Sequence, residues 1–316
     1  MSDLHTEEVK TRGPSQRHRQ ATLVRLIAVG VDGSPEGRDA TVLAAMIAGA
    51  TGAELMLVSV HPDPILVLPS EMNWSGMEEQ AEAFLRDVRD DVAPNARTVV
   101  ETDSSVARAL ENVVRREHRD LLVVGSNRHA PDGHVRIGNR TRQLLGDARC
   151  ALAVAPRGIG TRPQQRIETI GIGYDGGPES SDALARAGAL ALAAGAKLRV
   201  RAVVDDLVRG IGRREPQGRK PRKGDRSMYT ALASLRDLAE RAARATGSDA
   251  EVDVDFGDPV DALKQLSSEV DLLVIGSRRW GAVSRVLLGS TGEELMHDAG
   301  CAVMVVPRPA RPRLSR

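Results

Sequence analysis

Aromatic residues are scarce in this chain of 316 residues, where Phe, Tyr and Trp together make up 2%. Hydrophobic residues nevertheless account for 41% of the sequence, so packed cores must be built from Val, Leu, Ile and Ala. Aliphatic runs of this kind are typical of a parallel sheet that is covered by helices on both faces. The length also exceeds the usual size of one domain, which predicts two domains.

Other features are also absent, and each excludes a class of protein. The sequence has no run of about 18 apolar residues, which excludes a membrane-spanning helix. Two cysteines make no disulfide framework. The formal net charge of +1 lacks the basic excess of proteins that need nucleic acid as a partner. Residues 1–21 have no hydrophobic signal core and predict a flexible polar tail, so we expect a cytoplasmic protein.

Short aliphatic runs alternate with segments of helical periodicity along the whole chain. In the first half, the predicted strands are 26–31, 55–60, 97–101, 121–125 and 151–155, and the predicted helices are 37–50, 75–91, 105–117 and 141–148. In the second half, the predicted strands are 169–174, 198–204, 251–256, 272–276 and 301–306, and helices are predicted at 180–194, 227–246 and 261–269. This alternation predicts mostly parallel, doubly wound sheets with right-handed crossovers.

The two halves align with little freedom, which indicates a tandem duplication. Asp32 and Asp175 each follow the first strand of a half and are 143 residues apart. Four other pairs are each 151 residues apart, namely Gly125 with Gly276, Gly138 with Gly289, Cys150 with Cys301 and Pro156 with Pro307. The predicted domains are 22–157 and 167–308, with a linker at 158–166 and a basic Pro/Arg tail at 309–316.

Polar and glycine residues at the strand ends predict a binding site in each half. In doubly wound sheets, ligands bind beyond the carboxyl ends of the strands, where the strand order reverses. If the first and fourth strands are neighbours, Asp175 faces the same crevice as Gly276, and Asp32 faces the same crevice as Gly125. A glycine-containing loop then runs into a helix at Gly289, where backbone N–H groups point at an anion.

The stretch Gly276-Ser277-Arg278-Arg279, followed after nine residues by Gly289-Ser290, resembles the G-x-x-G-(nine residues)-G-[ST] signature of the universal stress protein family. The first-strand ends, at 29–34 and 173–176, resemble that family as well. So do Cys150 and Cys301, each of which is followed by an aliphatic strand and a proline. The chain is therefore identified as similar to tandem, UspA-like members of this family. The resemblance implies two flavodoxin-like, adenine-nucleotide-hydrolase-like α/β domains.

The resemblance also implies an adenine nucleotide as the ligand, ATP or ADP, with or without Mg²⁺. It places the ribose against Asp32 and Gly125 in the first domain, and against Asp175 and Gly276 in the second. It places the adenine against Val60 or Val203. The implied phosphate-binding residues are Ser277, Arg279, Gly289, Ser290 and Thr291 in the second domain and Arg128, Gly138 and Asn139 in the first. Arg128 and Arg279 replace the second glycine of the signature, and they either fill its space or supply a cation.

The helix starts after these loops also have an interpretation that needs no ligand. Ser290 with Glu293, and Thr291 with Glu294, match the spacing of a capping box, and the two acids complement the helix dipole. The first domain has no acid in the corresponding turn, and Arg128, His129, His134 and Arg136 lie just upstream. We hypothesise that this loop attracts an anion; the alternative is an exposed, solvated loop.

The remaining motifs point to no further chemistry. Gly171, Gly173 and Gly176 match G-x-G-x-x-G, but the first two must lie inside a strand, which disfavours a dinucleotide fold. The stretch from Arg209 to Arg226 holds eight basic residues without interleaved aromatics, which favours a solvated loop over a docking segment for nucleic acid, lipid or protein. No His/Cys spacing suits a metal, and no catalytic base or nucleophile can be nominated.

The sequence therefore predicts a cytoplasmic stress-response module that is not an enzyme. It would bind an adenine nucleotide, mainly in the second domain, and signal through its conformation. The alternatives are a nucleotide-free interaction module and a slow ATPase or nucleotidyl-transfer enzyme. The resemblance also implies that the last strands of the two domains, at 151–155 and 301–306, pair edge to edge, and it leaves a homodimer open.

Overall fold

The computed structural model describes residues 23–61, 74–147, 150–162, 166–205, 226–277 and 288–307. The polar tail at 1–21, the tail at 309–316 and all but the last residue of the basic stretch at 209–226 lie outside the described residues, as does Arg279. No helix in the described ranges is long and apolar enough to cross a membrane.

The two halves of the chain contain the same succession of strands and helices. The first comprises β1 (Leu26–Gly30), α2 (Pro35–Thr51), β2 (Glu54–His61), α3 (Trp74–Val92), β3 (Arg97–Thr102), α4 (Val106–Arg116), β4 (Leu121–Gly125), α5 (Asn139–Asp147) and β5 (Ala151–Ala155). A short 3₁₀ helix, η1 (Ile159–Thr161), follows in the linker. The second comprises β6 (Thr169–Tyr174), α6 (Pro178–Ala194), β7 (Lys197–Asp205), α7 (Arg226–Thr246), β8 (Ala250–Gly257), α8 (Pro259–Ser267), β9 (Leu272–Gly276), α9 (Ser290–Asp298) and β10 (Ala302–Val306).

Local sequence signals fix the first helix of each half. Helix α2 begins after Ser34, whose Oγ accepts a hydrogen bond from the N–H of Gly37 at 3.1 Å, and proline occupies its first turn. It ends at Gly52, which adopts a left-handed conformation with φ of 71°. Helix α6 begins with a proline in the same way and ends at Gly195 with φ of 63°. The same proline and the same terminal glycine therefore begin and end the first helix of each half.

All ten strands form one sheet in the order β3-β2-β1-β4-β5-β10-β9-β6-β7-β8. Within each half the pairs are parallel, β1 lies beside β4, and β6 lies beside β9. The strand order therefore reverses between the first and fourth strands, which is the condition on which the expected binding sites depended. This confirms the doubly wound α/β class for both halves.

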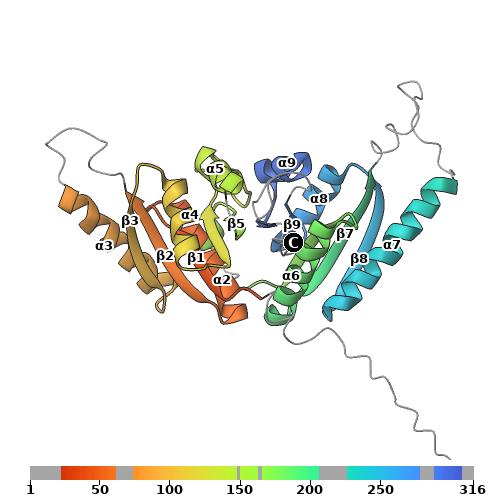
Figure 1. Cartoon of the computed structure of the whole chain (residues 1–316), viewed down its shortest axis with the longest axis horizontal. Coiled ribbons are helices and arrows are strands. Elements are labelled where there is room, and N and C mark those ends of the chain that lie inside the picture. The colour runs from red at the N-terminus through yellow and green to blue at the C-terminus, as the bar shows by residue number, and fades with distance from the viewer. Residues whose placement is uncertain are drawn as a thin grey trace, which may run out of the picture.

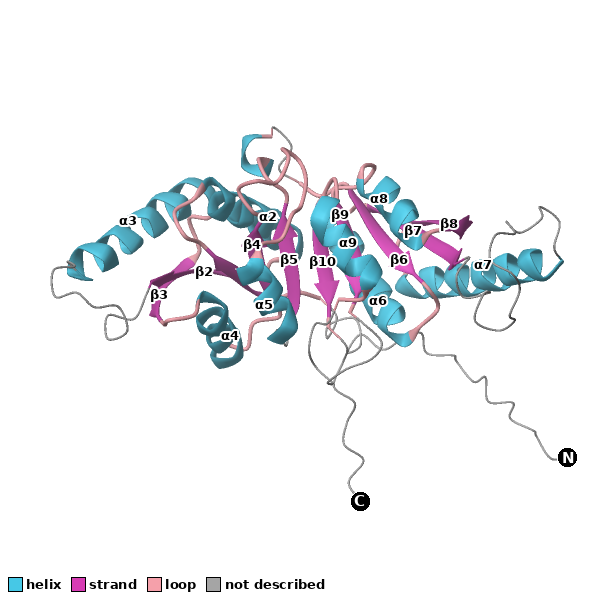
Figure 2. Cartoon of the chain, turned by 90° about the horizontal axis from the view of Figure 1, so that it is seen from above, coloured by secondary structure: helices cyan, strands magenta, loops and turns pink. Residues whose placement is uncertain are grey.

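The two halves meet where β5 and β10 pair in antiparallel orientation, with Met304 opposite Ala153 and Val303 opposite Val154. Figure 2 shows the two strands side by side at the centre of the sheet. Because the strands run in opposite directions here, the carboxyl edge of the first domain's strands lies beside the amino edge of the second domain's strands. The candidate sites therefore lie at opposite edges of the sheet.

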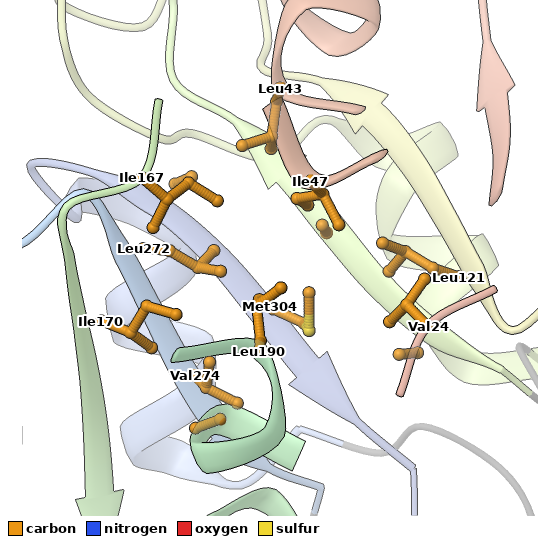
Figure 3. Packing of buried hydrophobic residues seen from close by; sticks show 14 of the residues in the cluster. Val24, Leu43, Ile47, Leu121, Ile167, Ile170, Leu190, Leu272, Val274 and Met304 are labelled. Atoms are coloured by element: carbon orange, nitrogen blue, oxygen red, sulfur yellow. The ribbon is translucent and has the colours of Figure 1, made fainter. Parts of the chain in front are cut away.

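Each face of the sheet carries one apolar core that continues across this seam. On one face, α2 and α3 pack with α6 and α7 over the sheet, and this cluster holds Leu43, Ile47, Leu190 and Met304 (Figure 3). On the other face, the cluster joins residues of α4 and α5 to residues of α8 and α9. In Figure 1, α3 and α7 lie at the two ends of the molecule, and α5 and α9 lie near each other at its centre.

A buried carboxylate holds the linker to the first domain. Asp39 in α2 is 4% exposed, and its two carboxylate oxygens accept hydrogen bonds from the N–H groups of Gly158 at 2.7 Å and Gly160 at 2.8 Å. Burial raises the pKa of Asp39, while the two backbone hydrogen bonds oppose this rise. The linker is thus fixed to α2 at the start of η1.

We expect Asp39→Ala to lower the free energy of unfolding by about 1–3 kcal/mol, because two buried N–H groups lose their acceptors. Asp182, which occupies the same place in α6, is half-buried, and Asp182→Ala is the matched control with a smaller loss. Burial raises the folded pKa of Asp39, so its contribution is largest below the unfolded pKa of about 4. That contribution declines as the pH rises through the folded pKa. Urea denaturation across pH measures both effects, and equal losses for both variants would contradict the assignment.

The G-x-G-x-x-G motif is explained by packing within the second domain. Gly171 and Gly173 lie inside β6, as predicted, beneath the side chains of α8. A Cβ at Gly173 would come within 2.9 Å of Leu263, and one at Gly171 within 3.1 Å of Leu266. These two glycines let α8 approach the sheet.

Candidate functional site

The register of the strands brings the predicted ribose and adenine residues together in both domains. In the second domain, Tyr174 pairs with Ala202 and Ile172 with Val274. Extending these registers places Asp175 level with Val203 and one residue beyond Gly276. The pairing of Gly30 with Val58 and of Val29 with Val123 places Asp32, Val60 and Gly125 in the same way. Each group occupies a carboxyl edge where the strand order reverses, which is where doubly wound folds bind ligands.

The two aspartates are exposed, and each one uses a single carboxylate oxygen to shape its own turn. Oδ1 of Asp32 accepts from the N–H of Ser34 at 3.2 Å and from its hydroxyl at 2.5 Å. Oδ1 of Asp175 accepts from the N–H of Gly177 at 2.7 Å and from the hydroxyl of Ser180 at 2.6 Å. Among the described contacts, Oδ2 of each aspartate accepts no hydrogen bond. One oxygen therefore orients the carboxylate, and the other can accept from a ligand hydroxyl.

The glycines at the ends of β4 and β9 have a packing role. A Cβ at Gly125 would lie 2.2 Å from the carbonyl oxygen of Glu36, in the first turn of α2. A Cβ at Gly276 would lie 2.7 Å from the carbonyl oxygen of Glu179, in the first turn of α6. The neighbouring helix, rather than a ligand, thus accounts for glycine at both positions. They shape the crevice by letting the helix start close to the strand.

A serine folds the first domain's loop back onto the strand ends. Ser126 follows β4 and is buried; its Oγ accepts from the N–H of Arg136 at 3.2 Å and donates to the carbonyl of Ala155 at 2.8 Å. The N–H of Asn127 donates to the carbonyl of Arg136 at 2.7 Å. These bonds return the chain to β4, so that a Cβ at Gly138 would lie only 3.2 Å from Nδ2 of Asn127. The start of α5 therefore lies close to the end of β4.

This loop also reaches across the seam into the second domain. The N–H of Val135 donates to the carbonyl of Ala299 at 2.8 Å, and the N–H of Ile137 donates to the carbonyl of Met296 at 2.9 Å. Both side chains are buried. The acceptors lie at the carboxyl end of α9, whose last carbonyls have no partner within the helix. The second domain thus helps to fix the first domain's loop.

Arg157 ties the same loop to α2. Its Nη1 donates to the carbonyl of Ala130 at 2.9 Å and lies 3.3 Å from the carboxylate of Asp132. Its Nε lies 3.9 Å from the carboxylate of Glu36. Arg157 and Ser126 were both missed as site residues, although Ser126 could have been found because it repeats as Ser277 at the offset of 151 residues.

The start of α9 corrects the capping-box interpretation. Gly289 is the N-cap residue, and no side chain caps it by a hydrogen bond. Ser290 and Thr291 are already the first two helical residues, so neither hydroxyl stands outside the helix as a capping box requires. The first helical bond runs from the N–H of Glu293 to the carbonyl of Gly289 at 2.9 Å. The N–H groups of Ser290, Thr291 and Gly292 have no hydrogen-bond partner among the described residues.

Three more residues were predicted for the second site, and the structure describes two of them, Gly289 and Ser277. Among the described residues, no atom lies within 4 Å of a Cβ built at Gly289, while residues 278–287 before it lie outside the described part of the chain. Ser277 is buried and its N–H donates to the carbonyl of Val306 at 2.9 Å. Arg279 lies outside the described residues, so its role stays a prediction.

The start of α5 carries cations where α9 carries acids. Asn139, Arg140 and Arg142 are exposed in its first turn, and Arg128 is exposed on the loop. Arg128 donates to Nε2 of His129 at 3.2 Å rather than to an acid. The corresponding turn of α9 contains Glu293. The two domains therefore present opposite charges at equivalent helix starts.

The two cysteines and the metal-binding side chains supply no reactive centre. Burial raises the pKa of both Cys150 and Cys301 to about 12, so neither thiol is a thiolate at neutral pH. Among the residues described, no group of three His, Cys, Asp or Glu side chains could hold a metal ion.

Fold and site together define a tandem α/β protein in which an aspartate and a glycine meet at the carboxyl edge of each doubly wound half, where the strand order reverses. The model of the universal stress protein family matches residues 24–156 and 166–307. The chain therefore belongs to the universal stress protein family. This confirms the family resemblance and the duplication.

Individual relatives agree with this assignment. Universal stress protein Rv2319c of Mycobacterium tuberculosis is 26% identical over 245 residues, which cover 75% of this chain and 80% of that protein. Universal stress protein Rv2005c of the same organism is 38% identical over 69 residues, so the match spans only 21% of this chain and 23% of that relative. The crystal structure of a universal stress protein from Archaeoglobus fulgidus superimposes with a TM-score of 0.64 at 18% identity, covering 90% of this chain and 98% of that one. At that identity, the likeness supports the fold alone.

Proposed function

We propose that this protein is a regulatory module that binds an adenine nucleotide, mainly in its second domain. The observation that carries the proposal is the start of α9, where three N–H groups precede the first helical bond and have no hydrogen-bond partner among the described residues. Helix starts of this kind bind phosphate through backbone N–H groups and the helix dipole. The capping box, which would have satisfied these groups without a ligand, is not formed.

The proposal assigns roles to four side chains of the second domain. Oδ2 of Asp175 accepts hydrogen bonds from ribose hydroxyls, because Oδ1 is held by Gly177 and Ser180. The half-buried side chain of Val203 packs against the base at the end of β7. The hydroxyls of Ser290 and Thr291, with their N–H groups, bind the phosphates. A bound nucleotide would supply the charge that these groups lack, and Mg²⁺ would accompany its phosphates.

The proposed action is binding without hydrolysis, in the cytoplasm. In this proposal the hydroxyls of Ser34 and Ser180 orient Asp32 and Asp175 in their turns, and neither pair is assigned as a nucleophile with its general base. The pairing of β5 with β10 keeps the two domains in one body in this proposal, so that a change at one crevice is carried by a shared core.

Calorimetric titration with ATP tests the proposal on the full chain. We expect Asp175→Ala to weaken binding by about tenfold to a hundredfold, since a charged acceptor of the ribose hydroxyls is lost. Asp182 lies in the second turn of α6, away from the residues assigned to the nucleotide. Asp182→Ala is therefore the matched control and should leave the affinity unchanged. Asp32→Ala should weaken ATP binding less than Asp175→Ala does. The reason is that the first domain has no hydroxyl at the position that corresponds to Ser290.

Two outcomes would redirect the assignment. If millimolar ATP produces no heat with the wild type, the nucleotide-free interaction module becomes the better hypothesis. If phosphate is released during the titration and Asp175→Ala abolishes that release, the protein is a slow ATPase.

A further inference from the structure

The first domain carries a group of four arginines, of which only Arg128 belongs to the nucleotide site that the family resemblance implies. From Ser126 to Leu145 the sequence contains four arginines, at 128, 136, 140 and 142, and a single acid, Asp132. Asp132 lies 3.3 Å from Arg157 and is therefore committed elsewhere. We call the four arginines the α5 basic patch.

The α5 basic patch is not neutralised within the part of the chain that the structure describes. None of its arginines forms an ion pair there, whereas several exposed arginines elsewhere do; Arg108 pairs with Asp103 at 2.5 Å, and Arg244 pairs with Glu240 at 3.4 Å. Arg136 donates to the carbonyl of His129 at 3.3 Å, which leaves its charge uncompensated. Unpaired cations of one sign in a small area create a local positive potential.

The patch also conflicts with the helix on which it lies. The N–H of Arg142 makes the first helical bond of α5, to the carbonyl of Gly138 at 3.0 Å. Arg140 and Arg142 therefore occupy the positive end of the helix dipole, where cations are unfavourable. In the duplicated helix α9, Thr291 and Glu293 stand at these places. A local conflict of this kind, resolved in the other copy, is expected at a functional site.

The arrangement of the patch favours an extended anion over a small one. Positions 140 and 142 point about 200° apart around the helix, so one phosphate cannot contact both side chains. Nη2 of Arg142 lies 3.1 Å from Nε2 of His297 in α9, so the patch continues across the seam between the domains. Figure 1 shows α5 and α9 near each other there. A ligand that spans the patch must carry several linked negative charges.

We propose that the α5 basic patch binds a linear inorganic polyphosphate chain across the seam. Guanidinium groups match phosphate oxygens through paired N–H donors, and the free N–H groups of the first turn of α5 bind one phosphate of the chain. No Phe, Tyr or Trp occurs from Ser126 to Leu145, so the patch lacks the stacking platform of a site for single-stranded nucleic acid. This site is in the first domain and does not depend on nucleotide binding in the second.

Binding of long-chain polyphosphate to the full chain, measured by calorimetry over a range of salt concentrations, tests the proposal. We expect the double variant Arg140→Gln with Arg142→Gln to weaken binding by about tenfold for each arginine, and the slope of log affinity against log salt to fall by about one for each. Arg241→Gln with Arg244→Gln is the matched control, because both arginines are exposed in α7 but paired with Asp237 and Glu240. The control should bind like the wild type.

Three results would overturn the proposal. Equal affinity for inorganic triphosphate would show that one small anion suffices, and equal or tighter binding of a single-stranded RNA of the same charge would identify a nucleic-acid surface. Equal losses in both double variants would reduce the effect to net charge. The loss of ATP affinity in Asp175→Ala reports on the second domain alone, so a failure of either proposal is recognised independently of the other.

Discussion

Gly125→Ala is expected to destabilise the protein by about 3 kcal/mol or more, although it adds a single methyl group. That methyl would lie 2.2 Å from the carbonyl oxygen of Glu36 and 2.6 Å from its carbonyl carbon. Both are backbone atoms in the first turn of α2, so no rotamer change relieves the contact. The whole helix start must move away from β4, which disturbs the core that α2 shares with the sheet.

Gly49→Ala is the matched control for this prediction. Gly49 lies on the exposed side of α2, and a Cβ there would meet nothing within 4 Å. Alanine in a helix interior is favoured over glycine by about 1 kcal/mol, so this variant should gain stability. Urea denaturation of both variants measures the two opposite signs. A Gly125→Ala protein as stable as the wild type would mean that α2 does not rest against β4 as described.

The same contact affects how ligand-binding data must be interpreted. Gly276 repeats the arrangement, with a Cβ 2.7 Å from the carbonyl oxygen of Glu179. The family resemblance assigns both glycines to the ribose, yet their neighbours in the structure are the backbones of α2 and α6. Loss of nucleotide binding in a variant of either glycine would therefore report a shifted helix start as readily as a lost ligand contact. Asp175 is the cleaner residue for testing the site.

The fold was predictable because its signals are repeated and local. Both halves contain aliphatic runs of five or six residues at fixed offsets. Both also have a proline after the turn that follows the first strand, and a glycine at the end of the first helix. Right-handed crossovers then leave few strand orders for such a pattern. The positions of Asp32 and Asp175 beside the fourth strands follow from that order. The alternation of strands and helices needs only periodicity and chain connectivity, whereas the adjacency of the first and fourth strands was assumed from flavodoxin-like strand orders.

The capping-box alternative at Ser290 could not be decided from the sequence because the deciding property is a backbone angle. Ser290 and Glu293 have the spacing of a capping box whether Ser290 precedes the helix or begins it. Gly289 takes the extended conformation, with φ of −79° and ψ of 175°, and the helix begins one residue later. The bonds from Val135 and Ile137 to α9 were equally invisible, since they join backbone groups and leave no side-chain pattern.

A difference between the two halves was visible in the sequence but was overlooked. Met56 and Val58 of β2 correspond to Arg199 and Arg201 of β7 at the offset of 143 residues. Arg201 is 7% exposed, and its guanidinium lies 3.1 Å from the carboxylate of Asp253 in β8. In the sequence, the acids at every second position of β8 indicate this pairing. The second domain thus replaces apolar contacts beside α8 with ion pairs, although the fold is unchanged.

Met304→Ala is expected to cost about 2–5 kcal/mol, the range for a large apolar side chain removed from a closed core. Met304 is 0% exposed on β10, opposite Ala153 of β5, and packs in the cluster that contains Leu43 and Leu190 (Figure 3). Small alanines on β5 cannot fill the space, so the cavity would open at the seam itself. The loss should therefore weaken the association of the two domains as well as the stability of the second.

Thiol labelling followed by peptide mass spectrometry separates these two effects. Cys150 and Cys301 begin the two seam strands, and burial raises the pKa of each to about 12, so both should resist labelling in the wild type. Opening of the seam in Met304→Ala should expose both thiols together, at a higher rate and below the unfolding transition. Met46→Ala, on the half-buried side of α2, is the matched control and should change neither rate. Labelling of Cys301 alone would place the weakness inside the second domain instead of at the seam.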